Sequence, residues 1–286
     1  GLDSGGHPES IPHLTYDDFK AFHHTSYHPS NARIFFSGDD PPEKRLALVQ
    51  DYLDGYQRLT TASSVHPQDR FSSPRRKVHP FAASAGQDNR VMLTMNRRLE
   101  PDGRAEEDMA LQILEAILVG MPASPLRKAL IDSGLGEELA GVGLEEELLQ
   151  MYFSTGLKGL APGSEEQVKN LVLNTLQKLA RDCFDPRTVE AAVNSIEFRY
   201  RENNSGSFPQ GLLYMLRALV TWLHDKDPLQ LLAFEQPLAR IKNRLAEGER
   251  LFEELVATCL CANHHRTTVI LTPDPLLEER QRTRED

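Results

Sequence analysis

The chain has 286 residues, of which 40% are hydrophobic and 26% charged, so it is long enough to bury one large core or two smaller ones. Its net charge of −10 argues against nucleic acid as the main partner, because phosphate binding needs a concentrated basic surface. No stretch approaches the apolar length needed to span a bilayer, and Gly1-Leu2-Asp3-Ser4 has no export signal, so we expect no membrane insertion. Because the chain starts without Met, we expect an internal piece of a longer polypeptide.

The three cysteines form an odd and sparse set, which favours a reducing, intracellular compartment over a disulfide scaffold. Two of them, Cys259 and Cys261, precede His264-His265, a combination that could hold zinc. Residues two apart on a helix point about 200° apart, however, so the two sulfurs would face different ways. Buried small side chains are therefore the favoured interpretation.

The first sixty residues predict helix, strand and helix. Thr15 begins a helix that ends near Ser26, with Asp18 completing a capping box. The apolar run Ala32–Ser37 predicts a buried strand, and a second helix is expected over Glu43–Tyr56. Residues 60–74 lack a sustained apolar period and predict a linker.

The next segment predicts two pairs of strands separated by two helices. The expected strands are Lys77–Ala82, Arg90–Asn96, Leu139–Leu144 and Leu149–Lys158, with Gly86–Asn89 as a turn after the first. The expected helices are Arg104–Val119 and Ser124–Gly134, with Gly134 as a left-handed cap.

The remainder is mostly helical and ends in one strand. Helices are predicted over Ser164–Asp182, from Asp185-Pro186, over Leu212–Trp222, from Asp227-Pro228 and over Glu249–Cys261. A strand is expected at Thr267–Leu271, before a charged, helix-prone tail. This order predicts an α+β fold with a mostly antiparallel sheet covered by helices.

The histidine cluster His24-Thr25-Ser26-Tyr27-His28 is the nearest approach to a zinc-peptidase motif. Tyr27 stands where the inverted motif needs Glu, and Thr25 where the forward motif needs it. Pro29 also disfavours helical geometry at His28, so the two rings are not expected to share a helical face. We interpret the cluster as a solvated helix end, and we predict no metal ligands and no catalytic residues in this chain.

Two short motifs carry a family resemblance. They are Tyr27-His28-Pro29-Ser30-Asn31-Ala32-Arg33 and Ser133-Gly134-Leu135-Gly136, with Ser4-Gly5-Gly6 upstream. The chain resembles the presequence-protease branch of the pitrilysin/insulysin family of zinc peptidases, although His7 stands where that family usually has aspartate. The resemblance implies a pitrilysin-type (LuxS/metallohydrolase-like) α/β roll.

The resemblance also implies a division into domains. Residues 1–59 would be the C-terminal part of a first peptidase roll without its catalytic helix, and 60–74 the linker. Residues 75–273 would form a second, non-catalytic roll, and 274–286 the start of a helical hinge.

In insulysin-type relatives the second roll presents an edge strand that captures peptide by backbone pairing. The matching residues are Leu139, Ala140, Gly141, Val142, Gly143 and Leu144. An exposed edge offers free N–H and C=O groups, so recognition can tolerate many sequences. The alternative is that Gly141 and Gly143 only mark a bulge.

The function implied is that of one part of an ATP-independent zinc metalloendopeptidase that degrades unstructured peptides in a closed chamber. Zinc would belong to the parent protein and none to this part, whose partners would be unfolded peptides and the remaining domains. The acidic runs Glu137-Glu138 and Glu145-Glu146-Glu147 could attract basic peptides, and the alternative interpretation is that they are ordinary solvated loops. The alternative is a catalytically inactive relative acting as a structural or peptide-binding subunit. The compartment implied is the mitochondrial matrix or plastid in a eukaryote, or the cytoplasm in a bacterium.

Overall fold

The structure is a computed structural model that describes residues 6–7, 10–61, 66–83, 90–99, 105–202 and 207–285. The chain divides into two compact units, Gly1–His66 with Glu285–Asp286, and Pro67–Arg284. The boundary lies inside the segment predicted as a linker. The predicted turn at Gly86–Asn89 and the start of the helix predicted from Arg104 lie outside the described residues.

The first unit contains two helices, α1 (Tyr16–Ser26) and α2 (Pro42–Leu53), and two short 3-10 turns (Ile11–His13 and Pro29–Asn31). The predicted capping box is confirmed, because the Asp18 amide donates to the Thr15 hydroxyl and the Thr15 amide donates to the Asp18 carboxylate. The strand predicted at Ala32–Ser37 is wrong. The segment pairs with no strand among the described residues, so it forms no ladder.

The helices of the first unit bury none of their own side chains in the part of the chain that is described. Their large apolar side chains are exposed, and Tyr52 keeps 82% of its surface. The exposed set comprises Ile11, Leu14, Tyr16, Phe19, Phe22, Tyr27, Ile34, Phe36, Leu46, Leu48, Tyr52, Leu53, Tyr56 and Leu59. The apolar side chains of α2 therefore pack on no core of the first unit among the described residues.

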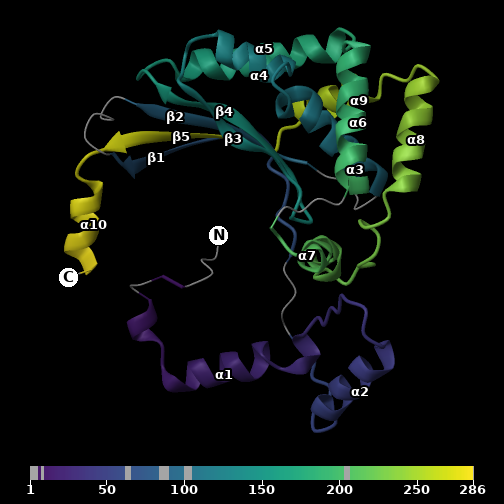
Figure 1. Cartoon of the computed structure of the whole chain (residues 1–286). Coiled ribbons are helices and arrows are strands. Elements are labelled where there is room, and N and C mark those ends of the chain that lie inside the picture. The colour runs from purple at the N-terminus through teal and green to yellow at the C-terminus, as the bar shows by residue number, and fades with distance from the viewer. Residues whose placement is uncertain are drawn as a thin grey trace. The chain divides into compact units, whose positions relative to one another are not determined.

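The second unit is built on one five-stranded sheet (Figure 1). Its strands are β1 (Arg75–Ala82), β2 (Val91–Arg98), β3 (Glu138–Glu145), β4 (Tyr152–Leu160) and β5 (Arg266–Asp274). The spatial order is β1-β5-β2-β4-β3, in which only β1 and β5 run parallel. The prediction of a mostly antiparallel α+β fold is confirmed.

Helices cover one face of this sheet, where α4 and α5 lie across the strands (Figure 1). In chain order, the helices from residue 105 onward are α3 (Ala105–Glu115), α4 (Pro125–Asp132), α5 (Glu165–Arg181), α6 (Pro186–Glu202), α7 (Gln210–Trp222), α8 (Glu235–Ala246), α9 (Leu251–Leu255) and α10 (Leu277–Glu285). Along β2, buried Leu93 and Met95 alternate with half-exposed Met92, Thr94 and Asn96, so the opposite face keeps contact with solvent.

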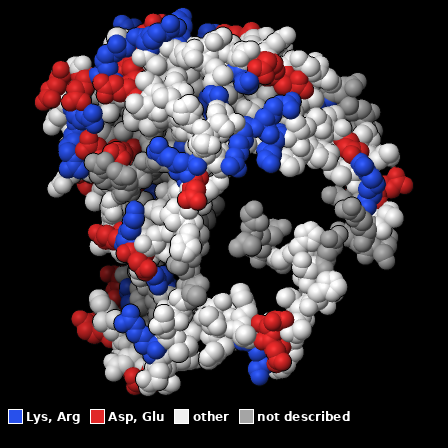
Figure 2. Space-filling view, turned by 180° about the vertical axis from the view of Figure 1, so that it is seen from behind, with Lys and Arg blue, Asp and Glu red and all other residues white. Residues whose placement is uncertain are grey.

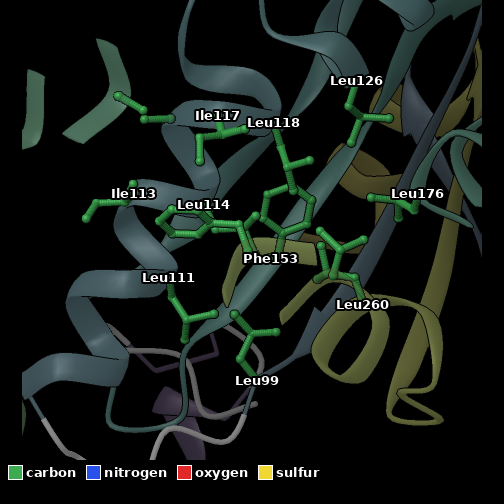
Figure 3. Close-up of a cluster of buried hydrophobic side chains, with 14 of the residues drawn as sticks. Leu99, Leu111, Ile113, Leu114, Ile117, Leu118, Leu126, Phe153, Leu176 and Leu260 are labelled. Carbon is green, nitrogen blue, oxygen red and sulfur yellow. The ribbon is translucent and has the colours of Figure 1, made fainter. Parts of the chain in front are cut away.

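The core lies between the covered sheet face and the helices (Figure 3). The residues labelled there are Leu99, Leu111, Ile113, Leu114, Ile117, Leu118, Leu126, Phe153, Leu176 and Leu260. The span Ala105–Asp132 is long and apolar enough to cross a membrane by composition, contrary to our expectation from the sequence, but 56% of its most apolar window is buried in the fold. Ile113, Ile117 and Leu118 are completely buried there, as in the core helix of a soluble protein.

Two helices depart from the prediction. No helix begins at Asp227-Pro228. The Asp227 carboxylate instead accepts from the Leu229 amide and its carbonyl accepts from the Thr221 hydroxyl, which makes a turn, so α8 begins only at Glu235. Ser164 occupies the N-cap position of α5 as predicted, but its hydroxyl donates back to the Ala161 carbonyl and caps no amide.

The second half of the predicted linker packs on the second unit. The Phe71 ring stacks on His265 at a centroid distance of 3.8 Å, and the Phe71 amide donates to His265 Nδ1. Gln68 and Gln150 exchange two hydrogen bonds between side chain and backbone. Residues 67–74 are therefore held by specific contacts and do not behave as a free tether.

One charged side chain, Arg97, is completely buried at the end of β2. Its Nε donates to the Leu260 carbonyl at 2.9 Å, where the π-helical turn Val256–Cys261 ends. Burial, with Arg266 nearby, lowers the pKa of Arg97 to about 9. Nη1 and Nη2 have no hydrogen-bond partner among the described residues, so the guanidinium group of Arg97 makes only part of the hydrogen bonds that it can donate.

Candidate functional site

The strand predicted as a peptide anchor lies at one edge of the sheet. The predicted span Leu139–Leu144 falls within β3, which pairs with β4 and with no other strand among those described. Val142 is 61% exposed. The geometry therefore offers a free strand edge, the arrangement that backbone pairing with an extended peptide requires.

The two glycines of β3 form a bulge, which was the alternative interpretation of the same residues. The register with β4 shifts between Ala140 and Gly143, and both glycines have positive φ, +96° at Gly141 and +72° at Gly143. A Cβ at Gly141 would lie 2.6 Å from the Ser154 carbonyl oxygen. The bulge and a binding role are compatible, because bulges commonly redirect an edge beside a site, and the binding role stays a prediction.

The Glu115 side chain lies next to Gly143 of the bulge. A Cβ at Gly143 would lie 2.6 Å from Glu115 Oε1, and the φ of +72° at Gly143 favours glycine. Burial raises the pKa of Glu115 above its ordinary value. Any side chain at Gly143 would therefore push a half-buried carboxylate out of place.

The acidic runs on either side of β3 differ in their partners. Glu137 is paired with Arg90, and Glu138 with Lys158 at 2.6 Å. Glu145, Glu146 and Glu147 form no ion pair with any described Lys or Arg. On the face drawn in Figure 2, charges of both signs are interspersed.

The histidine and cysteine clusters do not form a metal site. His28 lies beyond the end of α1, where its Nδ1 accepts from the Ser30 amide and its ring packs against Tyr56. Cys259 and Cys261 are half-buried against the core. No group of three or more His, Cys, Asp or Glu in the described parts of the chain could hold a metal ion, so these residues do not fit a zinc centre.

A buried carboxylate that the sequence analysis missed is Asp108 on α3. One of its carboxylate oxygens has no partner among the residues that the structure describes, and it lines a pocket together with Glu146 and Glu147. The sequence did contain a signal for Asp108, namely three polar residues within an apolar helix. Asp108, Gln112 and Glu115 are spaced four and three residues apart, so they lie on one face of that helix.

The sequence identifies the protein family to which the chain belongs. Residues 13–196 match the sequence profile described as "Peptidase M16 inactive domain". The match covers more than half of the chain, so the chain belongs to the M16 peptidase family, which confirms the family resemblance.

Individual relatives agree with this assignment. The chain is 44% identical over 282 residues to presequence protease 1 of Arabidopsis thaliana, a chloroplastic/mitochondrial protein, covering 96% of this chain and 26% of that protein. It is 33% identical to the mitochondrial presequence protease of Mus musculus, covering 97% and 27%. The chain thus spans about a quarter of the length of these curated relatives.

A solved structure shares the fold at low sequence identity. The crystal structure of a protease from Helicobacter pylori superimposes with a TM-score of 0.68 at 18% identity, covering 94% of this chain and 61% of that one. The α+β fold of M16 peptidase domains predicted from the sequence is therefore confirmed.

Proposed function

We propose that this chain is a non-catalytic part of an ATP-independent zinc metalloendopeptidase of the presequence-protease type. The parent protein would degrade unstructured peptides in a closed chamber, and β3 would anchor them there. The main support is the free edge of β3, with its exposed Val142 and its glycine bulge. The half-exposed sheet face of the second unit is what a chamber wall would present.

The first unit is proposed to complete a peptidase roll whose remainder lies in other sequence. Supporting this, its helices expose apolar side chains that an isolated soluble domain would bury. The same proposal includes the division into a first roll (residues 1–59), a linker (60–74), a second roll (75–273) and the start of a helical hinge (274–286). The organellar names of the relatives support a mitochondrial or plastid location for a eukaryotic parent, and a bacterial parent would be cytoplasmic.

The test uses an unstructured basic peptide and the intact chain. In an added strand, alternate backbone N–H groups face the neighbouring strand and the others face solvent. N-methylation of one alternate set should abolish binding, measured by isothermal titration calorimetry, and methylation of the other set should leave it. Equal effects of the two sets would exclude strand pairing.

Protein variants identify which edge is used. Val142 on β3 and Val78 on β1 are both exposed edge residues, so Lys should be tolerated at either. A lysine on an edge discourages strand addition and repels a basic peptide. Val142→Lys should weaken binding, and Val78→Lys is the matched control; the reverse ranking would assign the peptide to β1.

The competing proposal is a catalytically inactive relative that acts as a structural or peptide-binding subunit. It shares the strand edge and the lack of a fitting metal group among the described residues. The full-length polypeptide separates the two, because the peptidase requires an inverted His-x-x-Glu-His and the subunit would lack it.

A further inference from the structure

A pocket of about 90 Å³ opens in the second unit beside the end of β3. Its walls come from α3, from the residues that follow β3, and from α6 and α7, with Leu231 and Ala233 closing it. The volume exceeds that of a single water site and suits the end group of one side chain.

Asp108 lines this pocket with one carboxylate oxygen that has no hydrogen-bond partner in the described part of the chain. Its side chain is 4% exposed, and its Oδ1 is fully buried with no hydrogen-bond partner among the described residues. An unpaired buried carboxylate is expensive, and native structures rarely keep one without a reason. Burial, reinforced by Glu107 and Glu146 and opposed by Lys226, raises the pKa of Asp108 to about 7.

The donors in the surrounding wall are occupied elsewhere. The Arg217 guanidinium lies over the Tyr200 ring, 4.6 Å from its centroid. The Tyr200 hydroxyl and Arg199 Nη2 both donate to Gln112 Oε1, at 3.1 and 2.7 Å. The pocket therefore keeps its own cation on an aromatic face and leaves Asp108 available to a group from outside.

The charge of the lining is negative. Asp108, Glu146 and Glu147 contribute three carboxylates and Arg217 one guanidinium, so the ionised lining carries two net negative charges. A metal ion is a poor occupant, because these carboxylates do not converge into a group of three within the described chain. An organic cation, which needs one close carboxylate and a negative surrounding, fits better.

The pocket continues the strand edge. β3 ends at Glu145, and the next two residues, Glu146 and Glu147, belong to the pocket wall. A peptide strand added to β3 would therefore run past the pocket mouth and could place one side chain in it.

We infer that this pocket binds a Lys or Arg side chain of the peptide that pairs with β3, with Asp108 as its counter-ion. The inference rests on the proposed function and names its substrate class, an extended peptide with a basic residue at a fixed distance from the anchored segment. It also assigns a role to the unpaired acidic run, which would attract the cation to the pocket.

The experiment compares two capped peptides on the full chain. Each is N-acetylated, C-amidated and otherwise neutral, and carries either one Arg or the uncharged isostere citrulline, moved through successive positions. We expect one position at which Arg binds roughly tenfold more tightly than citrulline, as hydrogen bonds to a charged group allow. Asp108→Asn should bring that ratio to about one, and Asp132→Asn, an exposed aspartate on α4, should leave it.

The outcomes separate the two proposals. Equal binding of Arg and citrulline peptides at every position would overturn the pocket and leave strand anchoring intact. A preference for Arg that survives in Asp108→Asn would also overturn it. If neither peptide binds, strand anchoring fails and the pocket fails with it. Glu146→Gln provides a second variant should Asp108→Asn not fold, and it should reduce the ratio.

Discussion

Replacing Asp108 by Asn should stabilise the chain at neutral and alkaline pH. The unfolded carboxyl titrates near 3.8 and the folded one at about 7, because burial disfavours its charge. The folded state therefore binds the proton more tightly, so stability is greatest below the unfolded pKa and is lost as the pH rises through the folded pKa. Asn keeps the shape and removes the charge.

The size of the effect follows from the two pKa values. A shift from 3.8 to about 7 corresponds to about 4 kcal/mol when complete. Between about pH 5 and about pH 8 the wild type should lose roughly 2.5 kcal/mol relative to Asp108→Asn. Water entering the pocket would reduce this value, so it is an upper estimate.

The assay is urea unfolding followed by fluorescence of Trp222, the single tryptophan of the chain, which is the last residue of α7. The m-value should stay constant, so that the midpoint reports stability. Asp132→Asn is the control. Asp132 is exposed and paired with Lys128 at 2.7 Å, so its loss should change stability by less than about 1 kcal/mol at every pH. Parallel curves for wild type and Asp108→Asn would refute the reasoning, and wild type gaining stability with pH would show a cationic partner for Asp108.

Three other substitutions or measurements test other parts of the structure. Gly141→Ala should destabilise the chain by about 1–3 kcal/mol in urea unfolding, because its Cβ would clash with the Ser154 carbonyl at positive φ; an unchanged midpoint would contradict the bulge. Arg97→Met should cost less than about 1 kcal/mol or stabilise, since it loses one bond to Leu260 and removes a buried charge; a loss above about 3 kcal/mol would mean that Nη1 and Nη2 are satisfied. After dialysis, metal analysis should find no stoichiometric zinc, and one tight zinc per chain would contradict the absence of a fitting site in the described residues.

The sequence predicted the elements that have strong local signals. The Thr15 capping box, the left-handed Gly134 and the strand at Leu139–Leu144 all depend on near neighbours in the chain, and all three are found. The failures depend on distant partners. Ala32–Ser37 has strand composition but no adjacent strand among the described residues, and a strand needs a ladder.

For the candidate site, too, the features that depend on distant parts of the chain could not be predicted from local sequence. The edge position of β3 followed from the family resemblance, because strand order is a long-range property that periodicity does not determine. The burial of Asp108 could not be predicted from its neighbours Glu106 and Glu107, which look like an ordinary acidic first turn. Residues far along the chain surround it, since Tyr200 of α6 and Arg217 of α7 line the same pocket as Asp108.

At the two free edges of the sheet, the same charged residues can both prevent aggregation and select the peptide that binds. An unprotected edge invites aggregation, and proteins commonly guard it with charge or a bulge. β1 carries Arg75, Arg76 and Lys77, whereas β3 carries a bulge and ends in the run Glu145–Glu147, which forms no ion pair with any described Lys or Arg. The positive residues on β1 therefore repel cationic strands, and Glu145–Glu147 repel acidic strands from the end of β3. A guard of this kind leaves the edge open to extended cationic peptides, so the features that keep β3 from pairing indiscriminately also define the substrate class that we propose for it.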